Sequence, residues 1–143
     1  MVFETLYKDG KELAVHTDIN DNGQTVKVKV PEIGTKATVD GKKEVTASGR
    51  VKIEDIVSYK NLIPGKEYAV KGVLMNKATG EPLLADGKEI RSSFTFKPDK
   101  PDGEINITFV FDASGLKTAT EIVVFETLYR DGTEIAAHAD LKD

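Results

Sequence analysis

The chain has 143 residues, the length of one ordinary domain, and 39% of them are hydrophobic, which is enough for a buried core. Its 24 acidic and 20 basic residues give a formal net charge of −4, which disfavours nucleic acid as a partner because phosphates need clustered lysines and arginines. The chain has no cysteine, which excludes disulfides and thiolate metal sites. No apolar run approaches the roughly 20 residues of a membrane-spanning helix, so we expect no membrane insertion.

Most of the chain alternates apolar and polar residues with a period of two, which is typical of strands with one buried face. In chain order, the clearest predicted strands are Thr25–Val30, Thr35–Val39, Tyr68–Met75, Ile90–Phe96, Ile105–Phe111 and Ile122–Tyr129. Asp-Gly and Asn-Gly pairs between them supply the positive φ angles of tight hairpins. A short helical turn over Ile53–Val57 is the competing local structure. About nine short strands with close turns predict an all-β protein, a β-sandwich.

A segment near the start of the chain returns at its end. VFETLYKDGKELAVHTDIND, residues 2–21, aligns without gaps to VFETLYRDGTEIAAHADLKD, residues 124–143, and 13 of the 20 positions are identical. Such self-similarity indicates a tandem array whose repeats are out of phase with this chain. We expect residues 1–30 to be the C-terminal hairpin and last strand of one repeat. Residues 31–143 then form the next repeat without its own last strand, and any export signal or wall anchor lies outside this piece.

Both histidines, His16 and His138, occupy equivalent positions of the duplicated segment. The simplest interpretation is a half-exposed histidine on a strand. His16 with Asp18, and His138 with Asp140, would place two potential ligands on one strand face, which is too few for a strong metal site. A serine-hydrolase interpretation fails because the sequence has no Gly-x-Ser-x-Gly motif. We expect neither a metal nor a cofactor.

Several motifs resemble the repeats of VaFE-type surface-anchored proteins of Gram-positive bacteria. VVFETLY followed by DG, and then AVHTDINDNGQTV, carries the resemblance, together with PEIGTKAT at residues 31–38 and FVFDASGL at residues 109–116. The resemblance implies an immunoglobulin-like β-sandwich of the collagen-adhesin B type. It further implies an extracellular stalk domain of an adhesin on the bacterial cell wall surface, cross-linked by a Thr–Gln ester bond.

The resemblance also implies which residues form the ester. Thr35 matches the reactive threonine, and Gln24 matches the acyl donor. Thr38 is the competing nucleophile, but it lies three residues further on and therefore faces the opposite side of a strand.

Three further positions match residues that assist the reaction in this family. Asp55 matches the assisting aspartate, Glu126 the assisting glutamate and His138 the histidine. Glu4 and His16 are the counterparts of Glu126 and His138 in the first copy of the repeat.

These residue types suit ester formation. A threonine hydroxyl is a poor nucleophile until a neighbouring base takes its proton, and histidine or a carboxylate can do so. A buried, protonated carboxylic acid can polarise the amide of glutamine. Loss of ammonia leaves the ester. Each site reacts once, so we do not expect a turnover enzyme. The alternative is a sandwich that binds a ligand and forms no cross-link.

Gln24 and Thr35 are separated by only ten residues, whereas a parallel crossover usually takes a dozen or more. We therefore expect Gln24 to reach Thr35 of a neighbouring repeat or of another copy of the chain. Repeated between copies, this donation gives head-to-tail polymers. The competing outcome is a non-covalent monomer in which the first residues pack elsewhere or replace the equivalent C-terminal hairpin.

Overall fold

A computed structural model describes residues 2–16 and 25–142 of the chain. The predicted acyl donor Gln24 lies outside the described residues, as does the side chain of His16. Twelve strands form in the described part: β1 (Glu4–Lys8), β2 (Lys11–His16), β3 (Glu32–Val39), β4 (Val51–Lys60), β5 (Tyr68–Asn76), β6 (Glu81–Pro82), β7 (Leu84–Ala85), β8 (Lys88–Glu89), β9 (Arg91–Phe96), β10 (Gly103–Phe111), β11 (Ile122–Arg130) and β12 (Thr133–His138). None of the described residues belongs to a helix that could cross a membrane.

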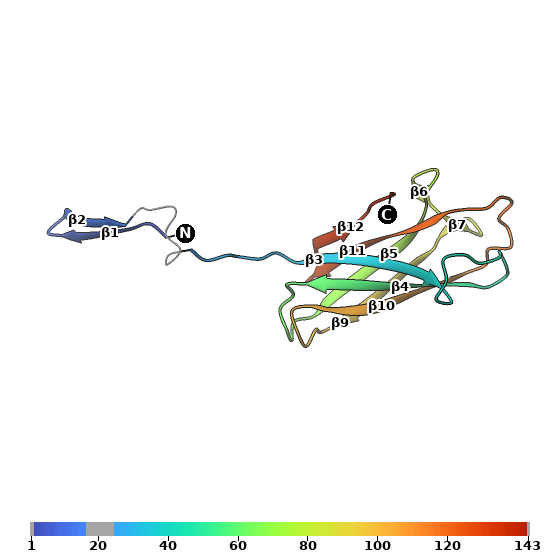
Figure 1. The fold of residues 1–143 in the computed structure, drawn as a ribbon, viewed down its shortest axis with the longest axis horizontal. Helices are drawn as coiled ribbons and strands as arrows, with labels where there is room; N and C mark the ends of the chain where they lie inside the picture. The colour runs from blue at the N-terminus through green and yellow to red at the C-terminus, as the bar shows by residue number, and fades with distance from the viewer. Residues whose placement is uncertain (1, 17–24, 143) are drawn as a thin grey trace.

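Two antiparallel sheets form a sandwich (Figure 1). One sheet has the order β10-β4-β3, and the other has the order β12-β11-β5, with β6 and β9 both paired to β5. The prediction of an all-β, immunoglobulin-like sandwich is therefore confirmed. Strand β3 lies at the edge of its sheet beside β4, and its last residue, Val39, also forms a backbone bridge with Lys42.

Strand β4 shows how the sequence sets the faces of these sheets. Every second residue from Val51 to Tyr59 is buried, including the charged Asp55, while the residues between them are more exposed. This period of two is the strand pattern, so the helical turn considered for Ile53–Val57 is wrong. An acidic residue therefore occupies an inward position of a central strand.

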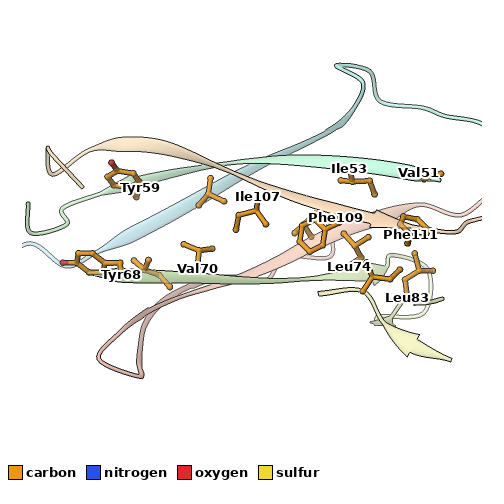
Figure 2. Close-up of a cluster of buried hydrophobic side chains, with 14 of the residues drawn as sticks. Val51, Ile53, Tyr59, Tyr68, Val70, Leu74, Leu83, Ile107, Phe109 and Phe111 are labelled. Carbon is orange, nitrogen blue, oxygen red and sulfur yellow. The ribbon is translucent and has the colours of Figure 1, made fainter. Parts of the chain in front are cut away.

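The core lies between the two sheets (Figure 2). Val70 and Leu74 of β5 face Ile107 and Phe109 of β10, and all four are almost completely buried. Burying each such side chain stabilises the fold by about 1.5–3 kcal/mol. At one end, the aromatic rings of Tyr59, Tyr68 and Phe96 pack with centroid separations of 5.3 and 6.1 Å.

The two copies of the duplicated segment form hairpins with one register. Glu4 of β1 lies opposite His16 of β2, and Glu126 of β11 lies opposite His138 of β12. Each hairpin also shifts register at the same position, between the leucine and the tyrosine of the VFETLY motif. Sequence alone thus determines the local structure of this segment.

The environments of the two hairpins differ completely. Leu128 of β11 is fully buried against the core, whereas its counterpart Leu6 in β1 is 61% exposed. In Figure 1 the β1–β2 hairpin lies apart from the sandwich. The hairpin folds in the same way in both places, but only β11–β12 is packed on a sheet.

The prediction of a strand over Thr25–Val30 is wrong for this structure. These residues form no strand, and Val26, Val28 and Val30 are 73%, 86% and 65% exposed. Their alternation suits a strand with one buried face, but all of residues 25–30 are exposed and belong to no strand. The segment ends where the Val30 carbonyl accepts a hydrogen bond of 2.9 Å from Asn61 Nδ2, at the start of β3.

Candidate functional site

Thr35 lies on the inner face of β3, with the residues that pack on the core, namely Ile33, Ala37 and Val39. In the ladder with β4, Thr35 is opposite Val57, and Asp55 is two residues away on the same face. The Oγ1 hydroxyl of Thr35 donates a hydrogen bond to Oδ1 of Asp55. The structure thus brings together the predicted nucleophile and the predicted assisting aspartate.

This pair has the arrangement of an activated nucleophile. Asp55 is fully buried, and a buried carboxylate is costly unless it is hydrogen-bonded or paired. The threonine hydroxyl provides one such bond and directs its proton at a group able to accept it. A lone pair of Oγ1 is left for attack on an electrophile that reaches the inner face of β3.

Thr38 lies on the other face of the same strand. It pairs with Glu54 of β4, whose side chain is solvent-accessible and forms an ion pair with Lys52 at 3.3 Å. The inner face of the strand therefore holds Thr35 and the outer face holds Thr38.

Glu126 is the second buried carboxyl of the sandwich. It projects from β11 between the buried residues Val124 and Leu128. Neither of its side-chain oxygens has a hydrogen-bond partner among the described residues. Burial disfavours the charged form of a carboxyl group, and the neutral form is a hydrogen-bond donor. Glu126 is thus placed to donate to an oxygen atom that enters the core.

His138 is the cross-strand partner of Glu126, so the two side chains emerge on the same face of the sheet. His138 is half-buried at the end of β12. Strand β12 is the edge of its sheet, and it lies beside β3, the edge of the other sheet. Thr35 with Asp55, and Glu126 with His138, therefore line the same side of the sandwich from facing sheets.

Gly72 of β5 is a residue that the sequence analysis missed. It lies opposite Glu126 in the ladder. A Cβ at this position would come within 2.7 Å of Phe109 Cζ and 3.5 Å of Glu126 Cγ. The absent side chain makes room for the Phe109 ring, which crosses the core from the opposite sheet to reach Gly72 beside Glu126. The available signal was a glycine inside an otherwise strong strand, which often marks a close approach.

We expect Gly72→Ala to destabilise the domain by about 1–3 kcal/mol, because the added methyl group overpacks the core at Phe109. Thermal unfolding followed by circular dichroism measures the effect. Gly34→Ala in β3 is the matched control, because a Cβ there meets no atom within 4 Å. An unchanged melting temperature for Gly72→Ala would contradict the close contact.

A groove of about 1080 Å³ lies beside β3 and is also lined by residues 42–45 and 47, which follow that strand. It begins at Thr35, continues past Val39 and is bounded on the far side by the start of β11. Its apolar wall is formed by Val51, Ile53, Phe111, Ala113, Val123 and Val124. Thr35 is thus one of the residues that line this groove.

Comparison with known families agrees with this geometry. The model of the T-Q ester bond containing domain matches residues 1–28 and 31–143. The chain belongs to the T-Q ester bond containing domain family. This confirms the prediction of a Thr–Gln ester-bond domain.

Solved structures show the fold of this T-Q domain. A bacterial adhesin from Mobiluncus mulieris, which contains intramolecular disulfide, isopeptide and ester bond cross-links, superposes with a TM-score of 0.69 in two crystal forms. The identity is 21%, and the match covers 80% of this chain and 55% of the adhesin chain. The T-Q domain thus spans about half the length of that structure.

A glycosyl hydrolase family 2 member from Bacteroides cellulosilyticus DSM 14838 also superposes, with a TM-score of 0.56 and 14% identity over 76% of this chain and 14% of the hydrolase. Both comparisons concern the fold alone. No curated protein matches the chain.

The remaining predicted residues of the T-Q domain lie elsewhere. Glu4 is exposed in the β1–β2 hairpin, apart from Thr35, and the backbone of His16 pairs with it. The described part of the chain contains no cluster of three or more potential metal ligands. Among the predicted residues, the structure therefore joins Thr35 to Asp55 by a hydrogen bond and places Glu126 opposite His138 on the other sheet.

Proposed function

We propose that this chain is a structural domain from the stalk of a bacterial surface adhesin, strengthened by an ester bond between Thr35 and Gln24. The hydrogen bond from the Thr35 hydroxyl to the buried carboxylate of Asp55 carries the proposal. The structural likeness to the adhesin from Mobiluncus mulieris, which contains ester bond cross-links, supports a role in an adhesin. We place the domain outside the cell, on the wall of a Gram-positive bacterium, as a repeat of the VaFE type.

The reaction joins the two side chains and releases ammonia. Oγ1 of Thr35 attacks the carboxamide carbon of Gln24 while Asp55 takes the hydroxyl proton. Glu126, in its neutral form, donates a hydrogen bond to the amide oxygen as negative charge develops there. The C–N bond then breaks, the nitrogen leaves with the proton returned by Asp55, and the C–O bond remains. Gln24 is the only glutamine of the chain, so no other donor of this type is present.

The folded sandwich accelerates this slow chemistry by holding the reacting groups together. Holding both groups in one place replaces a bimolecular encounter and is worth up to about 7–11 kcal/mol of the barrier. His138, the cross-strand partner of Glu126, is of a residue type that can accept and donate protons. Each site reacts once, so the domain modifies itself and turns over no substrate.

We further propose that the ester forms between chains. Gln24 precedes β3 of its own chain by too few residues to run alongside that strand. A neighbouring repeat or a second copy has no such restriction. Each chain then offers Gln24 to one neighbour and Thr35 to another, a heterologous contact that grows head to tail.

Two single variants test this function by complementation. Thr35→Ala keeps the donor and removes the acceptor, whereas Gln24→Ala keeps the acceptor and removes the donor. We expect neither variant alone to form covalent species and their mixture to give a covalent dimer that grows no further. Alkaline hydroxylamine should cleave that dimer. A mixture that stays monomeric on denaturing electrophoresis would contradict linkage between chains.

A further inference from the structure

The carboxyl group of Glu126 is buried without compensation. The residue is 1% exposed, and neither carboxyl oxygen has a hydrogen-bond partner among the described residues. A charge in such a place is costly, and a water molecule that reached the carboxyl would favour its charged form by solvating it. The neutral form, which the proposed reaction uses, therefore depends on keeping water away from this side chain.

Phe109 of β10 covers the inner face of the opposite sheet at Glu126. Its ring lies in the middle of the core (Figure 2) and ends on Gly72, where a Cβ would meet Phe109 Cζ at 2.7 Å and Glu126 Cγ at 3.5 Å. Gly72 and Glu126 are direct partners in the ladder between β5 and β11. The tip of the ring and the stem of the carboxyl side chain therefore meet over one backbone position.

The groove beside β3 brings solvent to the neighbouring layer of this core. It is lined by Phe111 of β10 and Val124 of β11, but not by Phe109 or Glu126. Phe111 follows Phe109 by two residues, and Val124 precedes Glu126 by two residues, so each shares a strand face with its neighbour. Phe109 and Glu126 thus lie one layer behind the groove.

We propose that Phe109 is a positioning residue for the ester reaction: its ring, which Gly72 makes room for, keeps water from Glu126 and so holds that carboxyl in its neutral, hydrogen-bond-donating form. The inference rests on the proposed function for the part that Glu126 plays in the reaction. A leucine in place of Phe109 leaves a space beside two unsatisfied oxygens, and a space with polar partners takes up water. The carboxyl then gives up its proton at a lower pH.

Two titratable side chains lie on the inner faces around Glu126. His138 is its cross-strand partner on β12, and Asp55 belongs to β4 in the facing sheet. The neighbours on the other packed strands, Gly72 of β5 and Phe109 of β10, do not titrate. Replacing Phe109 changes neither Asp55 nor His138, so an altered titration of Glu126 reports the access of water.

Carbon-13 NMR of the Gln24→Ala chain, which forms no ester, follows the titration of Glu126 directly, and Glu126→Gln identifies the signal by its loss. We expect Phe109→Leu to lower the midpoint of this titration by at least about one pH unit, because burial shifts the titration of carboxyl groups by up to about 3–5 units. Phe109→Met keeps more of the buried volume and should shift the midpoint in the same direction by less.

Phe111→Leu is the matched control. It removes the same atoms from the same face of the same strand and widens the groove. It leaves the Phe109 ring between the groove and Glu126, so the midpoint should stay that of the parent chain.

The rate of ester formation shows whether the neutral carboxyl matters to the reaction. Phe109→Leu is added to the Gln24→Ala acceptor, which is mixed with the Thr35→Ala donor, and the covalent dimer is followed against pH. Because only the neutral form of Glu126 donates, the rate falls as pH rises through its titration. We expect Phe109→Leu to move this fall to lower pH by the same amount as the NMR midpoint. The rate at lower pH should stay within about threefold of the parent rate.

An unchanged NMR midpoint in both Phe109 variants, or a rate lowered by one factor at every pH, would make Phe109 a packing residue only and overturn the proposal. A lowered midpoint with no covalent dimer even from the parent mixture would contradict the proposed function, while the exclusion of water from Glu126 by Phe109 would stand.

Discussion

Thr35→Ala should abolish every covalent species that the wild-type chain forms. The hydroxyl of Thr35 is the atom held by buried Asp55 on the inner face of β3, and alanine leaves no oxygen to attack the glutamine amide. Intact mass of the denatured protein measures the outcome. Wild type should show oligomers that lack one ammonia per link, and the variant only the unmodified monomer.

Thr38→Ala is the matched control for this experiment. It removes the same atoms from the same strand but on the outer face, opposite Glu54. We expect its covalent oligomers to match those of wild type. Loss of the oligomers in Thr38→Ala, with their persistence in Thr35→Ala, would show that Thr38 and not Thr35 is the nucleophile.

Asp55→Asn should slow ester formation by about 10²–10⁴-fold while the domain remains folded. Asparagine preserves the shape of the side chain and can still bond the threonine hydroxyl, but it does not accept the proton that must leave Oγ1. The rate is measured as the growth of the covalent dimer in the mixture of donor and acceptor variants, with Asp55→Asn added to the acceptor.

Glu54→Gln in the acceptor is the corresponding control. Glu54 is the neighbour of Asp55 in β4, but it is solvent-accessible and paired with Lys52. A surface ion pair of this kind contributes about 0–1 kcal/mol, so the rate and the melting temperature should both stay close to those of the parent. A wild-type rate for Asp55→Asn would show that the Asp55 carboxylate does not take the proton of Thr35.

The fold was predictable from the sequence because period-two alternation and Asp-Gly turns are local signals. They located β5, β10 and β11 to within a few residues. The same signal failed at Thr25–Val30, because alternation shows that a segment suits a half-buried strand and does not show that a partner strand is present. The two VFETLY hairpins lead to the same conclusion: the local structure is the same in both copies, but it is buried in one and exposed in the other.

The site was predictable only in part. Asp55 and Glu126 interrupt apolar runs, and an inward carboxylate in a strand is a signal that periodicity alone can detect. Thr35 is an ordinary strand residue in composition, and family resemblance was needed to select it. The role of Gly72 depends on the path of the Phe109 ring across the core, which requires the packing of both sheets and is not encoded at any one position.

The most direct test of the account is peptide mapping of the covalent species. Trypsin should release Gln24 in the peptide of residues 12–27 and Thr35 in the peptide of residues 30–36. Gln24 is the one glutamine of the first peptide, and Thr35 is the one threonine of the second. The account predicts one joined species with the mass of both peptides less one ammonia, whose fragmentation places the bond at Gln24 and Thr35. Recovery of both peptides separate and unmodified, from protein incubated at high concentration, would contradict it.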